Sequence, residues 1–222
     1  MRLLKRSFLL ITIMMAVVLV QPAFAQQMWQ EGEHYKMLPF PVKTRDASKI
    51  EVVEVFWYGC PHCYEFNNDF LPGWKKEMAE DVDFWLLPAT FPGWKEHAKA
   101  FYAAEFLGVS NTLHQPLFDA IVANPKKYKD IEDFEEIFTS NGVSKDDYYA
   151  IFETGGFRKI SRVDEAIQKA EARVKSYRIS GVPALIVNGK YKIGVRDAGS
   201  FANMIKIANY LISEERKNMA AE

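Results

Sequence analysis

The most constraining feature of this chain is the stretch at residues 53–63, which reads VEVFWYGCPHC. It contains both cysteines of a 222-residue sequence, Cys60 and Cys63, with two residues between them. The run from Ile50 to Trp57 is rich in Val and aromatic residues and predicts a strand, and its nearly continuous apolar character is typical of burial on both faces. Pro61 favours a helix that opens at Cys60-Pro61, because proline is well tolerated in the first helical turn. The two thiols are therefore expected in the first turn of a helix that directly follows a buried strand.

The spacing of the cysteines favours chemistry over structural stapling. A bridge between Cys60 and Cys63 would close a small ring, for which the chain-entropy model gives about 2 kcal/mol, less than for a long loop. The chain also has 16 Phe, 10 Tyr and 5 Trp, enough to build a core without disulfide support. We therefore interpret the pair as a redox centre.

The first 25 residues show the three parts of a secretory signal peptide. A basic start at residues 2–6 precedes an apolar run at residues 7–20, and Ala23-Phe24-Ala25 offers a small-x-small cleavage site. The apolar run is shorter than the ~20 residues of a membrane-spanning helix. We therefore expect cleavage near Ala25/Gln26 and export to an oxidising compartment, where thiols pair.

The charge of the chain argues against a nucleic-acid partner. The formal net charge is −1, and loss of the basic start would leave the exported part mildly acidic. The sequence contains no basic run of the kind that nucleic-acid-binding proteins use.

The rest of the chain predicts two strand-containing units separated by a helical block. Strands are expected at residues 34–38, 50–57, 82–87, 184–187 and 190–193, and Asn188-Gly189 predicts a tight hairpin turn between the last two. Removing the helical block leaves a β-α-β unit and a β-β-α unit, which indicates an α/β fold with an all-helical insertion.

Apolar residues between Trp94 and Tyr177 follow helical spacing. The first helix is expected at residues 97–107, before Gly108, and the second around Leu113, Leu117 and Ile121. Two shorter helices are expected after caps at Asp130 and Ser144. The last follows one helix face formed by Val163, Ile167, Ala170, Val174 and Tyr177. Breaks are expected at Pro72-Gly73 and at Gly155-Gly156, and Ser200 is expected to start a closing helix. We accordingly divide the chain into a signal peptide (1–25), a first sheet-containing part (26–92), a helical insertion (93–170) and a second sheet-containing part (171–222).

The helix start can activate one of the two thiols. A thiolate is the nucleophile of disulfide exchange, so a reactive cysteine needs a lowered pKa. Cys60 at the helix N-terminus would face unpaired N–H groups and the positive end of the helix dipole, and His62 would favour the thiolate further. Cys63, one turn into the helix, would be shielded and would resolve the mixed disulfide. Because a stabilised thiolate favours the reduced form, this arrangement predicts an oxidising disulfide.

Glu54 interrupts the apolar strand that leads to the cysteines. A carboxylate buried beneath the helix would have a raised pKa and could exchange a proton with Cys63. The alternative is a strand-end carboxylate that reaches water.

Pro183 stands just before the fourth predicted strand, in Gly181-Val182-Pro183. A cis bond before it would leave the Val182 backbone free to pair with an extended substrate. An ordinary trans proline at a strand start is the alternative that the sequence leaves open.

Together these residues resemble one known family. The stretch at residues 54–64 with its CPHC motif, Gly181-Val182-Pro183, and the hairpin at residues 187–191 are similar to DsbA, the family of periplasmic thiol:disulfide oxidoreductases. The resemblance covers essentially the whole exported chain and implies a thioredoxin fold with an inserted all-helical domain.

The resemblance also implies roles and partners. Cys60 would be the attacking and attacked sulfur, Cys63 the buried resolving thiol, and His62 the group that stabilises the thiolate, with Pro61 between them. Glu54 would be the buried acid, and Val182 and Pro183 would form the loop that binds substrate. The family implies a periplasmic monomer without cofactor or metal that oxidises reduced exported proteins and is reoxidised by a quinone-linked membrane protein of the DsbB type.

Three other functions are alternatives on the sequence: a disulfide isomerase or reductase, a metal-binding protein and a chaperone-like module. A disulfide isomerase usually has an N-terminal dimerisation domain, for which the sequence leaves no room, and a reductase would need an electron supply that no sequence shows. A zinc or copper site could use Cys60 and Cys63 with a histidine, but no second CxxC or HxxxH motif is present. The candidate histidines are His34, His62, His97 and His114, and apart from His62 we expect surface or capping positions for them.

A chaperone-like module is the last reading. It would hold unfolded chains on an exposed surface formed by Trp57, Tyr58, Phe91, Trp94 and Phe101. Most aromatic residues in a chain of this size lie in the core, which favours the core for most of these as well.

Overall fold

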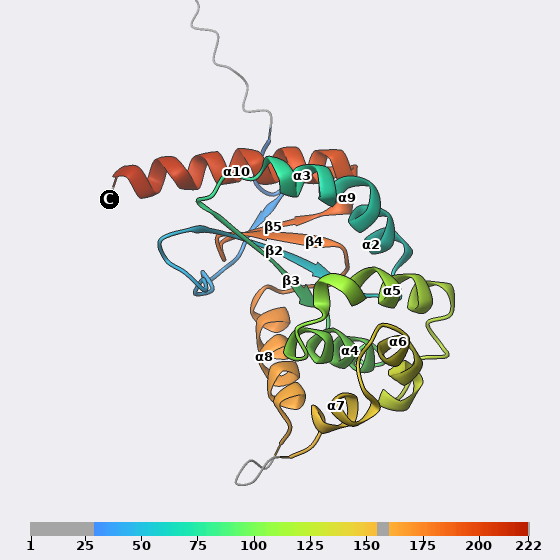
Figure 1. Ribbon diagram of the computed structural model, residues 1–222. Coiled ribbons are helices and arrows are strands. Elements are labelled where there is room, and N and C mark those ends of the chain that lie inside the picture. The colour runs from blue at the N-terminus through green and yellow to red at the C-terminus, as the bar shows by residue number, and fades with distance from the viewer. Residues whose placement is uncertain (1–28, 155–159, 222) are drawn as a thin grey trace, which may run out of the picture.

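The structure is a computed structural model and describes residues 29–154 and 160–221. The expected signal peptide and the expected break at Gly155-Gly156 lie outside the described residues. Figure 1 shows a central sheet with helices packed on it and a helical block beside one of its ends.

Within the described residues, five strands form one mixed sheet in the order β1-β5-β4-β2-β3. The strands are β1 Lys36–Met37, β2 Ile50–Phe56, β3 Val82–Pro88, β4 Ala184–Val187 and β5 Tyr191–Gly194. β2 and β3 are parallel, and the other pairings are antiparallel. The five predicted strands are confirmed, with ends that differ by one or two residues.

β2 is buried along its whole length, as its apolar run predicts. Because side chains alternate across a strand, Ile50 and Val52 pack with the core on one face, whereas Val53 and Val55 pack with the core on the other. The strand therefore lies in a sheet that has an apolar core on each of its two faces.

The register brings three loops to one edge of the sheet. Phe56 at the end of β2 pairs with Pro88 at the end of β3, and Val55 pairs with Ala184 at the start of β4. The segments that follow β2 and β3 and the segment that precedes β4 therefore meet at this edge, which we call the active edge.

The helix after β2 is longer than the sequence predicts. α2 (Pro61–Glu65) continues through a π-helical segment, η2 (Phe66–Phe70), into α3 (Leu71–Glu77). The expected break at Pro72-Gly73 is wrong. The Leu71 N–H donates to the Phe66 carbonyl, five residues back, and this wider turn starts α3 so that Pro72 lies in its first turn, where no N–H is needed.

The helical block follows β3, and its core is shared with the end of β2 and the CPHC turn. Its elements are α4 Lys95–Phe106, α5 Ser110–Ala123, the 3₁₀ turn η3 Ile131–Phe134, α6 Glu135–Ser140, α7 Lys145–Ala150 and α8 Arg162–Ser176. The expected caps are present: Asp130 forms a capping box with Asp133, and Ser144 accepts a hydrogen bond from the Asp147 N–H at 3.0 Å. Leu113, Leu117 and Ile121 are all buried in this core.

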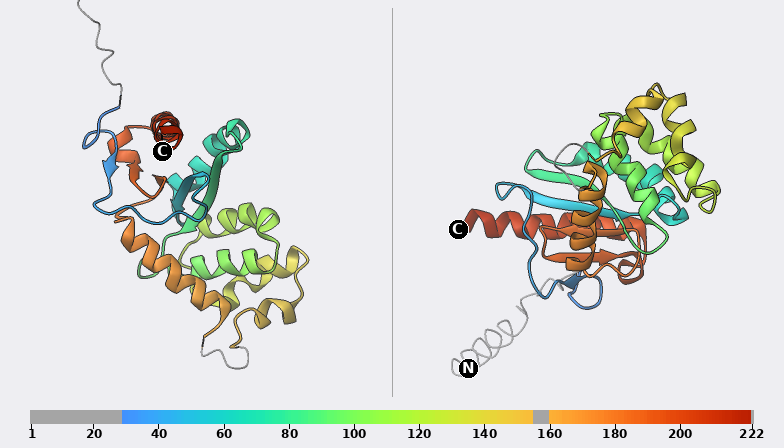
Figure 2. Two further views of the ribbon diagram at one scale, coloured as in Figure 1. Left: turned by 90° about the vertical axis from the view of Figure 1, so that its left-hand side faces the viewer. Right: turned by 90° about the horizontal axis from the view of Figure 1, so that it is seen from below.

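α8 connects the helical block with the sheet, as the left view of Figure 2 shows. Val163 and Ile167 near its start pack with Ala98 of α4, whereas Ala170 and Val174 near its end pack with the sheet core. The expected boundary at residue 170 falls inside this continuous helix, and the division into parts stays a prediction.

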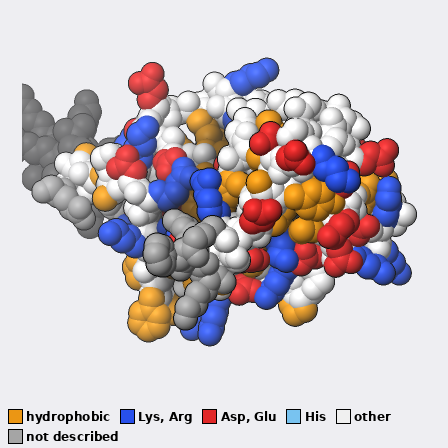
Figure 3. Space-filling model, turned by 60° about the horizontal axis from the view of Figure 1, so that its bottom comes forward, with side chains coloured by type: hydrophobic (Ala, Val, Ile, Leu, Met, Phe, Trp, Pro, Cys, Tyr) orange, Lys and Arg blue, Asp and Glu red, His pale blue; other side chains and the backbone are white. Residues whose placement is uncertain are grey.

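The chain ends with α9 (Val195–Ala198) and α10 (Phe201–Ala221), which lies along the sheet beside α3 (Figure 1). Met204, Ile207 and Leu211 of α10 pack in the same core as Leu185 and Val187 of β4. No helix among residues 29–154 and 160–221 combines the length and the hydropathy that a membrane span requires. Acidic and basic side chains are interspersed around apolar patches on the face shown in Figure 3.

Candidate active site

The turn between β2 and α2 places Cys60 at the mouth of the helix. The Cys60 N–H donates to the Trp57 carbonyl at 3.0 Å, and the Cys60 carbonyl accepts from the Tyr64 N–H at 3.0 Å. Pro61 opens the helix, and Cys60 is its N-cap residue, as expected from the sequence. Gly59 is required here because a Cβ atom at this position would lie 2.4 Å from the Trp57 ring.

The two thiols differ in exposure. Cys60 retains 8% of its accessible surface and Cys63 retains none, and both are unbridged thiols in this structure. The Cys63 N–H lies 3.3 Å from the Cys60 sulfur, which is the side-chain cap of α2. Only Cys60 is within reach of a second polypeptide.

The pKa values of the two thiols move apart. The pKa of Cys60 is lowered to about 6, first by the hydrogen bond from the Cys63 thiol, against the opposing effect of burial. The backbone N–H groups of Cys63 and His62 and the charge of His62 lower it further. The pKa of Cys63 is raised well above its usual value, mainly by burial. At neutral pH the reduced pair is therefore a Cys60 thiolate beside a Cys63 thiol.

His62 is exposed on the first turn of α2, with its ring 6.2 Å from that of Phe201. The sequence prediction gave the helix end and His62 the main part in lowering the Cys60 pKa. In the structure the Cys63 thiol contributes most, and the charge of His62 comes last among the causes. The neighbour inside the motif matters more because its S–H can donate directly to the thiolate.

Glu54 lies in the middle of the sheet, paired in register with Leu86 of β3 and Leu185 of β4. Only 1% of it is exposed, and its Oε1 has no hydrogen-bond partner among the described residues. Burial raises the pKa of Glu54 to about 8, although Lys75 opposes the shift. Its charge in turn helps to raise the pKa of Cys63. A carboxyl group whose pKa lies near neutrality can gain or lose a proton beside the buried thiol.

The peptide bond between Val182 and Pro183 is cis. The Cys60 sulfur lies 3.8 Å from the Val182 carbonyl, although the two residues are 122 positions apart. The fold thus brings together all the residues that the sequence singled out around Cys60.

A buried histidine, His97, and a half-buried one, His114, were missed. His97 and His114 were expected at surface or capping positions, and this is wrong. The Trp57 Nε1–H donates to His97 Nδ1 at 2.8 Å, and His97 Nε2 lies 3.0 Å from the Tyr128 carbonyl. Burial lowers the pKa of His97 and lowers that of His114 to about 4. No spacing in the sequence signals these contacts, because the partners come from other elements.

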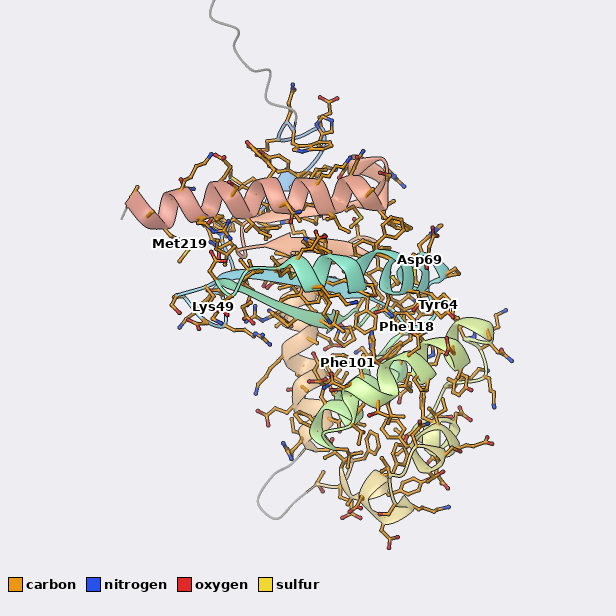
Figure 4. The ribbon with its side chains drawn as sticks, turned by 45° about the horizontal axis from the view of Figure 1, so that its top comes forward. Lys49, Tyr64, Asp69, Phe101, Phe118 and Met219 are labelled. Carbon is orange, nitrogen blue, oxygen red and sulfur yellow. The ribbon has the colours of Figure 1, made fainter. Side chains whose placement is uncertain are left out.

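His114 of α5 reaches the other side of the active-site turn. Its Nδ1 lies 2.9 Å from the Tyr58 hydroxyl, and its Nε2 lies 3.2 Å from Asn67 Oδ1. Figure 4 shows the same contact region, where Tyr64 and Phe118 lie together between α2 and α5. The helical block therefore supports the CPHC turn directly.

The described residues bear on two alternatives to a redox site, a metal site and a chaperone-like surface. No group of three or more His, Cys, Asp or Glu side chains in the described part of the chain could hold a metal ion. Of the five aromatic residues expected on a chaperone-like surface, Tyr58 and Phe101 are 1% and 5% exposed and belong to the core. The other three, Trp57, Phe91 and Trp94, are half-buried.

A thioredoxin-type sheet with a CxxC pair at a helix start, facing a proline loop, defines a protein disulfide oxidoreductase. Residues 71–206 match the family model of the DSBA-like thioredoxin domain. A DsbA of Azotobacter vinelandii, named thiol:disulfide interchange protein, is 39% identical over 186 residues, 83% of this chain and 84% of that protein. Its counterpart in Pseudomonas aeruginosa PAO1 is 35% identical over 210 residues, 94% of this chain and 96% of that protein.

Solved structures of DsbA proteins are also similar to this chain in fold. The crystal structure of Pseudomonas aeruginosa DsbA has a TM-score of 0.77 at 34% identity and covers 86% of this chain and 97% of its own. The oxidoreductase DsbA from Xylella fastidiosa has a TM-score of 0.73 at 34% identity and covers 84% and 97%. The chain belongs to the DsbA family of thiol:disulfide oxidoreductases.

Proposed function

We propose that this chain donates a Cys60–Cys63 disulfide to reduced polypeptides after their export. The observation that supports this most is the separation of the two pKa values, low for Cys60 and high for Cys63. A thiolate stabilised in the dithiol form makes the disulfide a strong oxidant, because reduction is then favoured.

The exchange proceeds in two steps. A substrate thiolate attacks the Cys60 sulfur of the disulfide, the Cys60–Cys63 bond breaks, and Cys63 leaves with the electron pair and takes up a proton. A second substrate thiolate then attacks the substrate sulfur of the mixed disulfide, and Cys60 leaves as the stabilised thiolate. The substrate has lost two electrons and gained a disulfide, and the protein holds the dithiol. If the second substrate thiolate attacks slowly, Cys63 attacks the Cys60 sulfur of the mixed disulfide instead. This releases the first substrate thiolate and re-forms the Cys60–Cys63 disulfide.

Glu54 is proposed as the proton donor for the leaving Cys63 sulfur. Its burial and its pKa of about 8 leave it protonated at neutral pH, and its electrostatic coupling to Cys63 indicates that the two groups are near each other. His62 is proposed to stabilise the Cys60 thiolate through its charge and its backbone N–H.

Val182 and Pro183 are proposed to bind substrate. The Val182 carbonyl, 3.8 Å from the Cys60 sulfur, could accept a hydrogen bond from an extended substrate segment next to its reacting cysteine. Pro61 stands at the first helical position, directly after Cys60.

The remaining parts of the proposal come from the family. We place the exported protein in the periplasm as a monomer without cofactor, with a signal peptide cleaved near Ala25/Gln26. Its substrates are reduced exported polypeptides, and a quinone-linked membrane protein of the DsbB type returns it to the disulfide form. We retain the parts 26–92 and 171–222 as the thioredoxin-like domain and 93–170 as the insertion.

The reduction potential tests this function. The exported chain is equilibrated with defined ratios of reduced to oxidised glutathione, and thiolate absorbance is recorded against pH. We expect a potential well above the roughly −270 mV of thioredoxin and a Cys60 pKa far below that of a free thiol. A potential near that of thioredoxin would instead indicate a reductase.

A further inference from the structure

A cavity of about 650 Å³ opens between the loop after β3 and the loop before η3. Its lining includes three aromatic residues, Trp57, Trp94 and Tyr128, and three lysines, Lys95, Lys126 and Lys129. We call it the aromatic–basic cavity. None of the steps proposed above uses it.

The aromatic wall of the cavity is rigid. The Trp57 and Trp94 rings stack at 4.2 Å with planes 3° apart. The Trp57 Nε1–H is held by buried His97, which also contacts the Tyr128 carbonyl at 3.0 Å. Stacked and hydrogen-bonded rings need no reordering when a ligand binds, so the wall is preformed for an aromatic or apolar group.

The cavity shares one residue, Trp57, with the turn that carries Cys60. The loops after β2 and β3 meet at the active edge because Phe56 pairs with Pro88. Trp57 forms part of the cavity wall, and its carbonyl accepts from the Cys60 N–H, so one residue joins the cavity to the CPHC turn. On the other side, Trp94 packs against the same core as Val182. Trp57 and the core around Trp94 and Val182 therefore link the cavity wall to the surroundings of Cys60.

The rim of the cavity is positively charged. Lys126 and Lys129 are exposed and form no ion pair with another residue among 29–154 and 160–221, whereas Lys95 pairs with Glu171 of α8. Glu96 is the acidic residue among the lining residues, and its carboxylate pairs with Lys99 at 2.9 Å. Lys129 also acts electrostatically on Asp133, which lies outside the lining. With three lysines and one glutamate among its lining residues, the cavity remains complementary to an aromatic side chain with a neighbouring carboxylate.

We propose that the aromatic–basic cavity selects substrates, by binding an aromatic side chain next to an acidic residue near the cysteine that is oxidised. This inference rests on the proposed function, since it names the class of reduced polypeptide that Cys60 oxidises fastest. The aromatic group would lie against the Trp57–Trp94 wall, and the carboxylate would lie between Lys126 and Lys129.

Two reduced peptides of equal length, each with two cysteines, test the proposal. One carries a Trp and an Asp next to the first cysteine, and the other carries a Ser and a Lys at the same places. The kcat/KM for peptide oxidation is measured with the exported chain and with the double variant Lys126→Glu, Lys129→Glu. We expect the unmodified protein to prefer the Trp-Asp peptide by about tenfold at low salt, which is about 1.4 kcal/mol, and the double variant to lose that preference.

A matched control keeps the same change of charge away from the cavity. Lys49 and Lys76 are exposed, and Figure 4 shows Lys49 far from Tyr64 of the active-site helix. The variant Lys49→Glu, Lys76→Glu should therefore retain the peptide preference. Raising the salt concentration should weaken the preference of the unmodified protein, because exposed charges are screened. Trp94→Ala tests the aromatic part and should reduce the preference by about fivefold.

The outcomes distinguish a failure of the substrate-selection proposal from a failure of the proposed oxidase function. Equal rates for the two peptides would overturn the substrate selection and leave the oxidase function intact. A preference that survives in the Lys126, Lys129 variant, or that disappears equally in the control, would also overturn it. If neither peptide nor glutathione is oxidised, the proposed function itself fails. The lysine variants change only exposed side chains, so the test does not depend on whether Trp94→Ala folds.

Discussion

The lowered pKa of Cys60 makes a quantitative prediction about stability. The thiol has an ordinary pKa of 9.0, and in the folded dithiol protein its pKa is about 6. A group whose folded pKa is lowered stabilises the protein fully above the unfolded pKa, and this stabilisation is lost as the pH falls through the folded pKa. Linkage gives about 2.6 kcal/mol more stabilisation at pH 8 than at pH 5, at 1.36 kcal/mol per pKa unit.

The assay is urea unfolding of the reduced protein between pH 5 and pH 8, beside the reduced variant Cys60→Ser. Other groups, including Glu54, titrate in both proteins and largely cancel in the difference of unfolding free energies. Cys63 also cancels, because its raised pKa keeps it protonated throughout this range. The difference between the proteins should therefore grow with pH, and half of the change should be complete near pH 7.

A flat difference would refute the reasoning. If the two unfolding free energies stay parallel within about 0.5 kcal/mol from pH 5 to pH 8, the Cys60 pKa is not lowered in the folded state. The argument for an oxidising disulfide would then lose its physical basis. An ordinary thiol, whose pKa is the same in the folded and the unfolded protein, would give this flat difference.

Three further predictions follow from the buried groups and the glycines. Because burial raises the pKa of Glu54 from 4.5 to about 8, its cost grows as the pH rises, so Glu54→Gln should stabilise the protein by about 2.5 kcal/mol more at pH 7 than at pH 5 in urea unfolding. His114→Ala removes a half-buried, doubly hydrogen-bonded ring and should lower the unfolding free energy by about 1–3 kcal/mol; a loss below about 0.5 kcal/mol would contradict these contacts. Gly189→Ala should cost at least about 2 kcal/mol, because φ is +60° and the new Cβ would lie 2.0 Å from the Val42 carbonyl oxygen. Gly73→Ala, where nothing lies within 4 Å, is its control and should stabilise α3 by about 0.5–1 kcal/mol; equal effects at the two positions would refute the assignment.

Much of the fold could be predicted because its signals are local. The run from Ile50 to Trp57 predicted a strand buried on both faces, and Asn188-Gly189 predicted the hairpin turn, in which both residues have positive φ. Ser144 predicted a helix cap. Pro72 shows the limit of such reasoning. Local rules predict a helix break at this proline, but a π-helical turn places it in the first turn of α3, where a proline is tolerated.

The site was predictable in part for the same reason. Cys60, Pro61 and Cys63 lie within one helical turn, so their order in the sequence specifies their geometry. The dominant cause of the lowered Cys60 pKa was missed, because the hydrogen bond from the Cys63 thiol depends on side-chain orientation within the turn. His97 was missed because its partners, Trp57 and Tyr128, come from other segments.

The sequence by itself determined that a redox pair stands at the start of a helix after a buried strand, because backbone propensity and short-range hydrogen bonds act between neighbours. Only the tertiary structure decided which groups meet that pair. The Val182 carbonyl lies 3.8 Å from the Cys60 sulfur across 122 positions, and Glu54 acquires its raised pKa from burial in the packed chain. Desolvation and contact between distant segments are properties of the packed chain, and no local pattern of residues contains them.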